Sequence, residues 1–188
     1  MSHMPWVSRG LFAVAIACVV SAGCSDPSPP IAAGAARVQY GRAQQGGTTC
    51  PAEISSVVTI GQVDSQSHQA VADNTNEVYV QCSIRSDGNT AKLRGKLTFA
   101  STIVVFSDIE LSSTGRTEGY GLGVISSATA LKRYAPVPDY PCTFDVIDMN
   151  QTGVWFGATC PVVGTDSAQH GQCSFINAYF YVENCDVF

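Results

Sequence analysis

Charged side chains are scarce in this sequence of 188 residues. Only 13% of the residues are charged, with 10 Lys and Arg against 15 Asp and Glu, and the net charge is −5. The few basic residues form no run along the chain. Proteins that bind nucleic acid depend on clustered Lys and Arg to neutralise phosphates. We therefore expect no nucleic acid among the partners of this protein.

A long apolar run is also missing at the amino end. The segment LFAVAIACVV, residues 11–20, contains ten residues and follows a short stretch that carries Arg9. A helix needs about twenty apolar residues to cross a bilayer. A shorter apolar segment behind a basic residue is typical of a cleaved signal peptide. This segment therefore predicts export rather than a membrane span.

Signatures of catalysis are absent as well. Beyond the leader the only histidines are His68 and His170, both in polar stretches, and no Gly-x-Ser-x-Gly motif presents a serine nucleophile. We expect neither catalytic activity nor a cofactor. An alternative is a small secreted hydrolase whose site the fold assembles around His68 or His170.

A cysteine among small residues follows the apolar segment. The sequence VVSAGC, ending at Cys24, resembles the lipobox of bacterial lipoproteins, although Ser21 stands where that family usually has Leu or another aliphatic residue. The resemblance implies that residues 1–23 are removed and that Cys24 becomes the acylated first residue, anchored in a membrane of the bacterial cell envelope. By analogy with a known sorting rule, Ser25 favours the outer membrane. The alternative is an ordinary leader cut after Ala22.

The number of cysteines is consistent with acylation. Of eight in the chain, Cys18 leaves with the leader and Cys24 takes the lipid, and six can then pair completely: Cys50, Cys82, Cys142, Cys160, Cys173 and Cys185. A cut after Ala22 would leave an unpaired seventh in an oxidising compartment. Six cysteines allow fifteen pairings. We favour Cys160–Cys173, with Cys50–Cys82 and Cys142–Cys185 as the remaining two.

Composition divides the chain into three parts. After the signal peptide, residues 24–49 are rich in Pro, Gly, Ala and Ser and lack sustained periodicity, which is typical of a flexible tether. Residues 50–188 form a single β-rich domain. Its predicted strands, in addition to a hairpin within 76–99, are 54–63, 102–111, 120–127, 143–148, 153–160 and 174–184. Only residues 127–134 suggest a helical turn.

About eight short strands separated by turn residues predict an all-β fold, an antiparallel β-sandwich or open barrel stabilised by disulfides. Asp87-Gly88 predicts a type I′ hairpin, which sets Ile84 opposite Ala91 and Cys82 opposite Leu93. Apolar side chains then share one face. The other face carries three cations, which we interpret as a solvated surface that also deters edge pairing: Lys92, Arg94 and Lys96.

Two segments resemble parts of metal sites. Asp148, Asn150 and Thr152 precede a glycine as in a calcium loop, but Thr159 stands where the bidentate acid belongs. A polar turn explains the same residues, and the sequence leaves the choice open. The second segment is HGQC, which with Cys160 and Cys185 could supply four zinc ligands. Disulfides are the better explanation in an exported domain, so we expect no metal.

Aromatic residues gather near the carboxyl end. Alternation within AYFYV places Tyr179 and Tyr181 on one face and Ala178, Phe180 and Val182 on the other, which we expect in the core. With Trp155, the two tyrosines are a candidate platform for a sugar or another partner. The expected function is thus a lipid-anchored extracytoplasmic domain with a structural, adhesive or ligand-binding role toward a protein or glycan at the cell surface. A carbohydrate-binding module is a further alternative.

Overall fold

A computed structural model describes residues 28–43, 50, 57–126, 133–165 and 173–188 of the chain. All regular structure in these residues is strand, fifteen strands in total, and three disulfides link them. No helix among them has the length and apolarity needed to cross a bilayer. The predicted all-β, disulfide-stabilised fold is therefore confirmed. The predicted signal peptide and the predicted acylation site at Cys24 lie outside the described residues.

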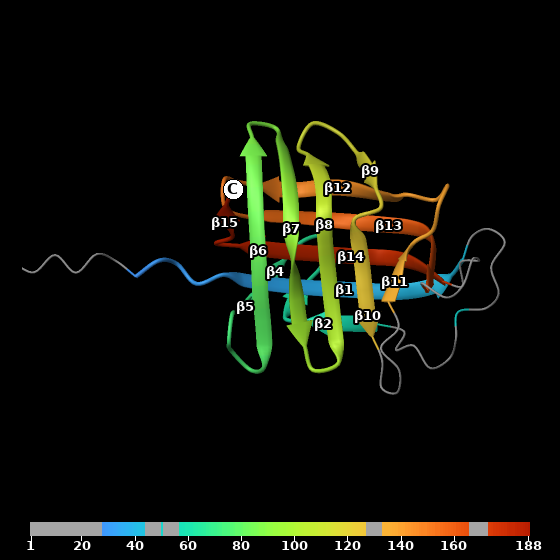
Figure 1. Ribbon diagram of the computed structural model, residues 1–188, viewed down its shortest axis with the longest axis horizontal. Helices are drawn as coiled ribbons and strands as arrows, with labels where there is room; N and C mark the ends of the chain where they lie inside the picture. The colour runs from blue at the N-terminus through green and yellow to red at the C-terminus, as the bar shows by residue number, and fades with distance from the viewer. Residues whose placement is uncertain (1–27, 44–49, 51–56, 127–132, 166–172) are drawn as a thin grey trace, which may run out of the picture.

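The strands form two layers that face each other (Figure 1). The front layer, green to yellow in Figure 1, contains β6 (Val78–Asp87), β7 (Thr90–Phe99), β8 (Thr102–Ser112) and β10 (Leu122–Ser126). The back layer runs crosswise behind it and contains β12 (Cys142–Met149), β13 (Val154–Thr165), β14 (Cys173–Glu183), β1 (Ala33–Arg42) and β2 (Val57–Ile60).

One side of the sandwich is closed by hydrogen-bonded strands. β11 (Arg133–Pro136) pairs with β10 of the front layer and with the end of β13 in the back layer. β13 can reach both regions because its pairing with β14 shifts register twice, and bulges of this kind bend strands around corners. β9 (Thr117–Gly119) pairs with β12 beside the same layer. The result is a sandwich that is continuous on this side.

The opposite side is open at the edge of β6. The short β15 (Asp186–Val187) pairs with β6 in parallel, the one departure from antiparallel pairing among the pairs that the structure describes. β5 (Val71–Ala72) pairs with the start of β1 on this side. At this edge the backbone amide of Val80 in β6 donates a hydrogen bond to Asp73 Oδ1, 2.7 Å, instead of to another strand. A small ribbon of β3 (Gln62–Val63) and β4 (His68–Gln69) forms a separate sheet.

Phenylalanines from both layers meet in the core. Phe106 of β8 packs edge-on against Phe180 of β14, with ring centres 5.6 Å apart, and lies 6.0 Å from Phe156 of β13. Phe144 of β12 extends this cluster. Ala178, Phe180 and Val182 are all buried, which confirms the face predicted for them. Such dense packing explains why the apolar alternation of these strands fixes their orientation.

The predicted flexible tether is wrong for residues 33–42, which form β1. Residues 33–42, which the composition placed in a flexible linker, are an interior strand of the back layer between β14 and β2. Both faces of its first half are buried, and a side chain at Gly34 would come 2.5 Å from a methyl group of Leu97. The run AGAA was misread because small residues also allow close packing on two faces. The domain therefore begins before residue 50.

The hairpin of β6 and β7 is confirmed, but its turn is one residue further on. Asp87 pairs with Thr90, so Gly88 and Asn89 form the turn, and Gly88 at φ 60° in its first position fits type II′ rather than type I′. Ile84 consequently pairs with Leu93 and Cys82 with Gly95. The pairing shifts by two residues, an even number, and the predicted faces are kept.

The cationic residues of β7 lie on the solvated outer face, as expected. Arg94 and Lys92 form ion pairs with Asp108 of β8, and Lys92 also approaches Glu110. Because β7 is an interior strand between β6 and β8, these cations guard no edge, which corrects that part of the interpretation. The predicted helical turn is also corrected where it is described, since Arg133 and Tyr134 belong to β11.

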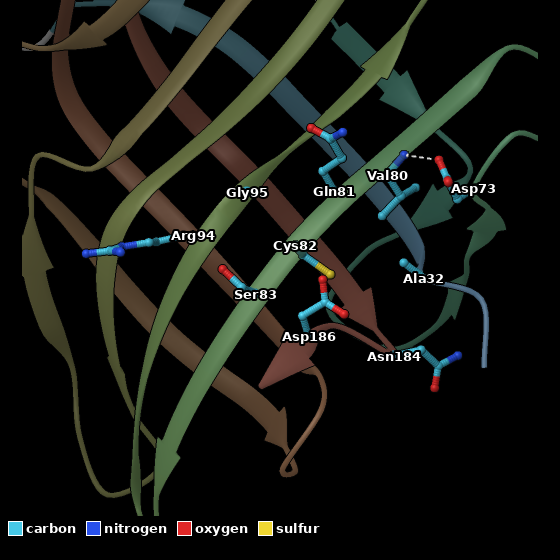
Figure 2. Close-up of a pocket in the computed structure, with 10 residues that line it drawn as sticks. All are labelled: Ala32, Asp73, Val80, Gln81, Cys82, Ser83, Arg94, Gly95, Asn184 and Asp186. Carbon is cyan, nitrogen blue, oxygen red and sulfur yellow. Dashed lines mark hydrogen bonds between the residues drawn. The ribbon is translucent and has the colours of Figure 1, made fainter. Parts of the chain in front are cut away.

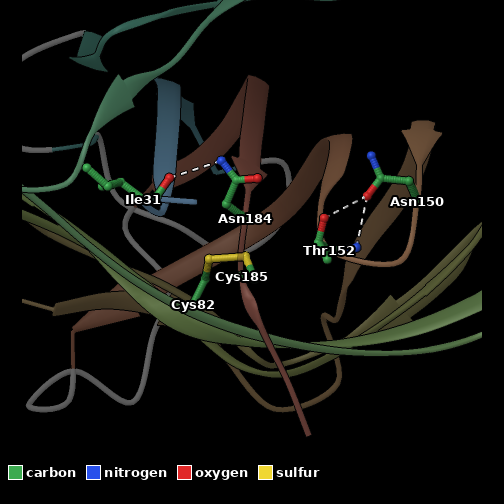
Figure 3. The surroundings of a disulfide bond; sticks show 6 residues. All are labelled: Ile31, Cys82, Asn150, Thr152, Asn184 and Cys185. Atoms are coloured by element: carbon green, nitrogen blue, oxygen red, sulfur yellow. Dashed lines mark hydrogen bonds between the residues drawn. A yellow bond between two sulfur atoms is a disulfide. The ribbon is translucent and has the colours of Figure 1, made fainter. Parts of the chain in front are cut away.

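All six predicted cysteines are paired, but none of the favoured pairings occurs. The bonds join Cys50 to Cys173, Cys82 to Cys185 and Cys142 to Cys160. Cys142 and Cys160 lie across from each other on neighbouring antiparallel strands, 4.1 Å between their Cα atoms. Sequence spacing alone could not reveal that β12 and β13 are neighbours there. Cys82 of β6 and Cys185 after β14 connect the front layer with the segment that leaves the back layer (Figure 3).

Candidate functional site

The outer face of the back layer carries the aromatic residues singled out in the sequence. Trp155 of β13 lies directly opposite Tyr181 of β14, and Gly157 lies opposite Tyr179 on the same face. All three aromatic side chains are half-buried. The predicted shared face of Tyr179 and Tyr181 is therefore correct. The three rings do not, however, form one exposed row.

The β3–β4 ribbon covers two of the three rings. His68 of β4 stacks on Tyr181, with ring centres 3.6 Å apart and planes at 16°, and meets Trp155 edge-on at 4.8 Å. The indole N–H of Trp155 donates a hydrogen bond to the Asp64 carbonyl oxygen, 3.0 Å. Trp155 and Tyr181 thus hold the ribbon on the sheet and present no open platform.

The turn of the ribbon is itself capped by a carboxylate. The backbone amides of Gln66 and Ser67 donate hydrogen bonds to Asp64 Oδ1 at 2.7 and 2.9 Å, and they lower the pKa of Asp64 below its usual range. This cap fixes the position of Ser65 above the sheet. The ribbon is therefore a defined wall at one end of the outer face.

Tyr181 has a second restraint. Its hydroxyl donates a hydrogen bond to Glu183 Oε2, 2.9 Å. Burial first, and then this bond and the charge of Glu183, raise the pKa of Tyr181 to about 12. The ring is consequently neutral and fixed over the physiological pH range. Its role in the structure is to hold the ribbon.

The surroundings of His68 do not favour the hydrolase alternative. Over the part of the chain that the structure describes, its ring contacts two aromatic rings and forms no hydrogen bond to a serine or carboxylate. A general base needs such a partner within hydrogen-bond distance. His170, the other candidate, lies outside the described residues.

Tyr179 is the ring that the ribbon leaves accessible. It borders a cavity of about 250 Å³ on the outer face, between β12, β13, β14 and the ribbon turn at Ser65. Gly157 also lines the cavity. An added Cβ at this position would come 3.3 Å from the Tyr179 ring. The glycine thus leaves room for the aromatic ring to lie over the strand.

Irregular pairing in two strands directs side chains into this cavity. Ile147 is an extra residue in β12 between the pairs Val146–Phe156 and Asp148–Trp155, and it is 40% exposed. Asn177 falls at the register shift of β14 and has φ 50°, a left-handed conformation that asparagine tolerates better than most residues. Bulges often redirect side chains near functional sites. Here both of these residues line the cavity.

Polar groups complete the lining. The Arg116 Nε donates to Asp145 Oδ1, 2.6 Å, and thereby orients this carboxylate. The Asn177 amide nitrogen donates to Gln39 Oε1, 3.3 Å, which leaves its carbonyl oxygen available. Thr159 adds an exposed hydroxyl. The cavity therefore combines one aromatic ring with hydrogen-bond acceptors and donors, an arrangement typical of small-ligand sites.

A larger cavity of about 470 Å³ lies along the open edge of β6 (Figure 2). Three of its polar side chains already have partners: Asp73 accepts from the Val80 amide and from the Asn74 side chain, Asn184 donates to the Ile31 carbonyl, and Arg94 is paired with Asp108. Phe188 also packs under the Arg94 guanidinium, 5.1 Å from the ring centre. This cavity is best explained as the edge of the open sandwich.

The segment that resembles a calcium loop forms a hydrogen-bonded turn between β12 and β13. The Thr152 amide donates to Asn150 Oδ1, 2.9 Å, and Thr152 Oγ1 approaches the same oxygen (Figure 3). The Thr152 carbonyl then accepts from the Cys185 amide, 2.8 Å. These bonds account for the polar residues of the segment.

The two candidate metal sites can be compared with the side chains that the structure describes. No three His, Cys, Asp or Glu side chains come together there as metal ligands. The zinc hypothesis is wrong because Cys160, Cys173 and Cys185 belong to three separate disulfides.

Sequence reasoning identified Tyr179 but missed the residues around it. Asp145, Thr159 and Asn177 come from three strands, and only the sheet pairing brings them together. Asn177 offered one signal, because an asparagine within an apolar strand pattern favours a bulge or a left-handed residue. The sequence around Asp145 and Thr159 contained no such signal.

Comparison with known proteins gave no match: no family model, no curated protein and no solved structure matches this chain.

Proposed function

We propose that this protein is a lipid-anchored, extracytoplasmic β-domain that binds a ligand or partner without catalysis. The observation that carries this proposal is the complete pairing of the six cysteines that follow Cys24. Disulfides persist in oxidising compartments and are rare in the cytosol. An even number of paired cysteines also agrees with Cys24 being used for acylation rather than for a bridge.

The cavity beside Tyr179 supports the binding role. It combines an accessible aromatic ring with oriented polar groups, whereas the described residues offer no nucleophile paired with a base. A membrane attachment through two or three acyl chains would be stable, since a single chain gives only marginal binding. The membrane partner is therefore the bilayer of the cell envelope, with the outer membrane favoured by Ser25.

Intact-mass analysis of the protein extracted from membranes tests the proposal. We expect a chain that begins at Cys24, heavier by a diacylglyceryl group and an acyl group, and lighter by two hydrogens for each disulfide. Treatment with a thiol-reactive reagent without reduction should leave the mass unchanged. A water-soluble product that begins at Gly23 and carries a reactive thiol would refute lipid attachment.

A further inference from the structure

We propose that the cavity beside Tyr179 binds a single pyranose ring, either free or as one unit of a glycan. This inference deepens the proposed binding role and rests on it. The evidence is the cavity on the outer face of β12, β13 and β14, together with the groups that face it.

The size of the cavity limits the ligand. At about 250 Å³ it falls below the range of roughly 300–1,000 Å³ that is usual for drug-sized ligands. A single six-membered ring with its substituents suits this volume, and an extended aromatic molecule does not. Because the cavity lies on the outer face of the sheet, neighbouring units of a glycan can continue into solvent.

The chemistry of the lining matches a sugar ring. A pyranose has an apolar face of C–H groups and a rim of hydroxyls. Tyr179 and the half-exposed Ile147 offer apolar surface to the face. Asp145, Asn177 and Thr159 offer acceptors and a donor to the rim.

The protein orients two of these polar groups, and one wall of the cavity, before a ligand arrives. Arg116 orients the Asp145 carboxylate, Gln39 holds the Asn177 amide, and the Asp64 cap fixes Ser65 at the far wall. A preorganised site loses less freedom on binding than a flexible one. Phosphate or another anion is not favoured, because the carboxylate of Asp145 faces the cavity and Arg116 is already paired with it.

The decisive experiment is saturation-transfer NMR on the intact protein, purified from whichever fraction contains it. The probes are the methyl glycosides of glucose, galactose, mannose and N-acetylglucosamine, and a mixture of tripeptides. We expect transfer to the ring protons of at least one glycoside, with a Kd of roughly 1–10 mM, as is usual for so small a ligand. Transfer to none of the four, or to the tripeptides alone, overturns the proposal.

Variants place the binding at this cavity. Tyr179→Ala should weaken glycoside binding more than tenfold, whereas Tyr79→Ala, which removes a tyrosine 52% exposed on the front layer, should leave it unchanged. Thr159→Val removes one hydroxyl at constant size and should weaken binding by roughly two- to tenfold. Equal binding by the Tyr179→Ala and Tyr79→Ala proteins overturns the proposed site. If Tyr179→Ala does not fold, Thr159→Val is compared with Tyr79→Ala instead, and equal binding by these two proteins overturns the proposed site.

A last comparison separates the two sources of the sugar. A trisaccharide of the glycoside that binds should bind at least as tightly as the glycoside if the natural ligand is a glycan, and more weakly if it is a free sugar. These results do not depend on acylation, because mass analysis measures that separately. Failure of the sugar proposal would thus leave the lipid anchor standing, and the reverse also holds.

Discussion

At the scale of single residues, similar side chains have different roles on one face. Tyr179 and Tyr181 are two positions apart on β14 and share its outer face, but His68 stacks only on Tyr181. Tyr181, which is itself restrained by its hydrogen bond to Glu183, packs against the ribbon through His68, whereas Tyr179 borders the cavity. The different roles of the two tyrosines depend on where the ribbon ends, and not on the side chains themselves.

The high pKa of Tyr181 gives a test of this arrangement. In a phenolate absorbance titration we expect one tyrosine to ionise near pH 12, and this step should disappear in Tyr181→Phe. Because the pKa is raised in the folded state above the value of about 10 in the unfolded chain, stability should fall as pH rises from 10 to 12. Tyr181→Phe should show a smaller fall over that range. A Tyr179→Phe protein is the control and should keep the step at high pH.

At the scale of elements, bulges and glycines shape the strands. In β7 the register shifts at Arg94, and Gly95 next to it has φ 151°. An added Cβ there would overlap the carbonyl oxygen of Gln81 and come 2.8 Å from the Cα of Cys82. Gly95 therefore permits the close approach of β6 and β7 at the cysteine that bridges to Cys185.

Substitution of this glycine should be costly. We expect Gly95→Ala to lower the free energy of unfolding by about 2–4 kcal/mol, because the new methyl group forces the two strands apart. Gly115→Ala is the matched control, since an added Cβ at Gly115 meets no atom within 4 Å, and it should change stability by less than about 0.5 kcal/mol. Urea denaturation measures both. Similar values for the two variants would show that the close approach at Gly95 is not needed.

The sequence allowed prediction of those elements that alternate clearly. The faces of β6, β7 and β14 followed from period-two patterns because a buried face fixes orientation. β1 was missed because small residues carry no alternation when both faces are buried. The disulfide pairing and the cavity depend on which strands are neighbours. That information lies in tertiary packing and not in the local pattern around Cys142 or Asp145.

At the scale of the whole molecule, the disulfides differ in what they connect. Cys142–Cys160 joins two adjacent strands across 18 residues of sequence, whereas Cys82–Cys185 joins β6 to the segment after β14 across 103 residues. The second bond also lies at the open side of the sandwich, where two residues of β15 are the only strand paired with the β6 edge in the described structure. It therefore stabilises the side that has the fewest strand pairs.

Removing the bridges one at a time should show this difference. The double variant Cys82→Ser/Cys185→Ser should lose about 3–5 kcal/mol of unfolding free energy, since the loop it closes is long. Cys142→Ser/Cys160→Ser should lose less, about 2–3 kcal/mol, because its loop is short and the strands remain paired. Guanidinium denaturation under non-reducing conditions provides the values. The opposite order would mean that the open side does not depend on the Cys82–Cys185 bridge.

The early start of β1 limits how far the folded domain can extend from the proposed membrane anchor. With the sandwich beginning at Ala33, only residues 25–32 separate it from the proposed acylated cysteine, rather than a linker that extends to residue 49. Eight residues span at most about 25–30 Å when fully extended. A protein anchored in this way stays within a thin shell above its bilayer. Free sugars can still diffuse to it, but an immobile partner such as a surface glycan must lie within that same short distance of the bilayer.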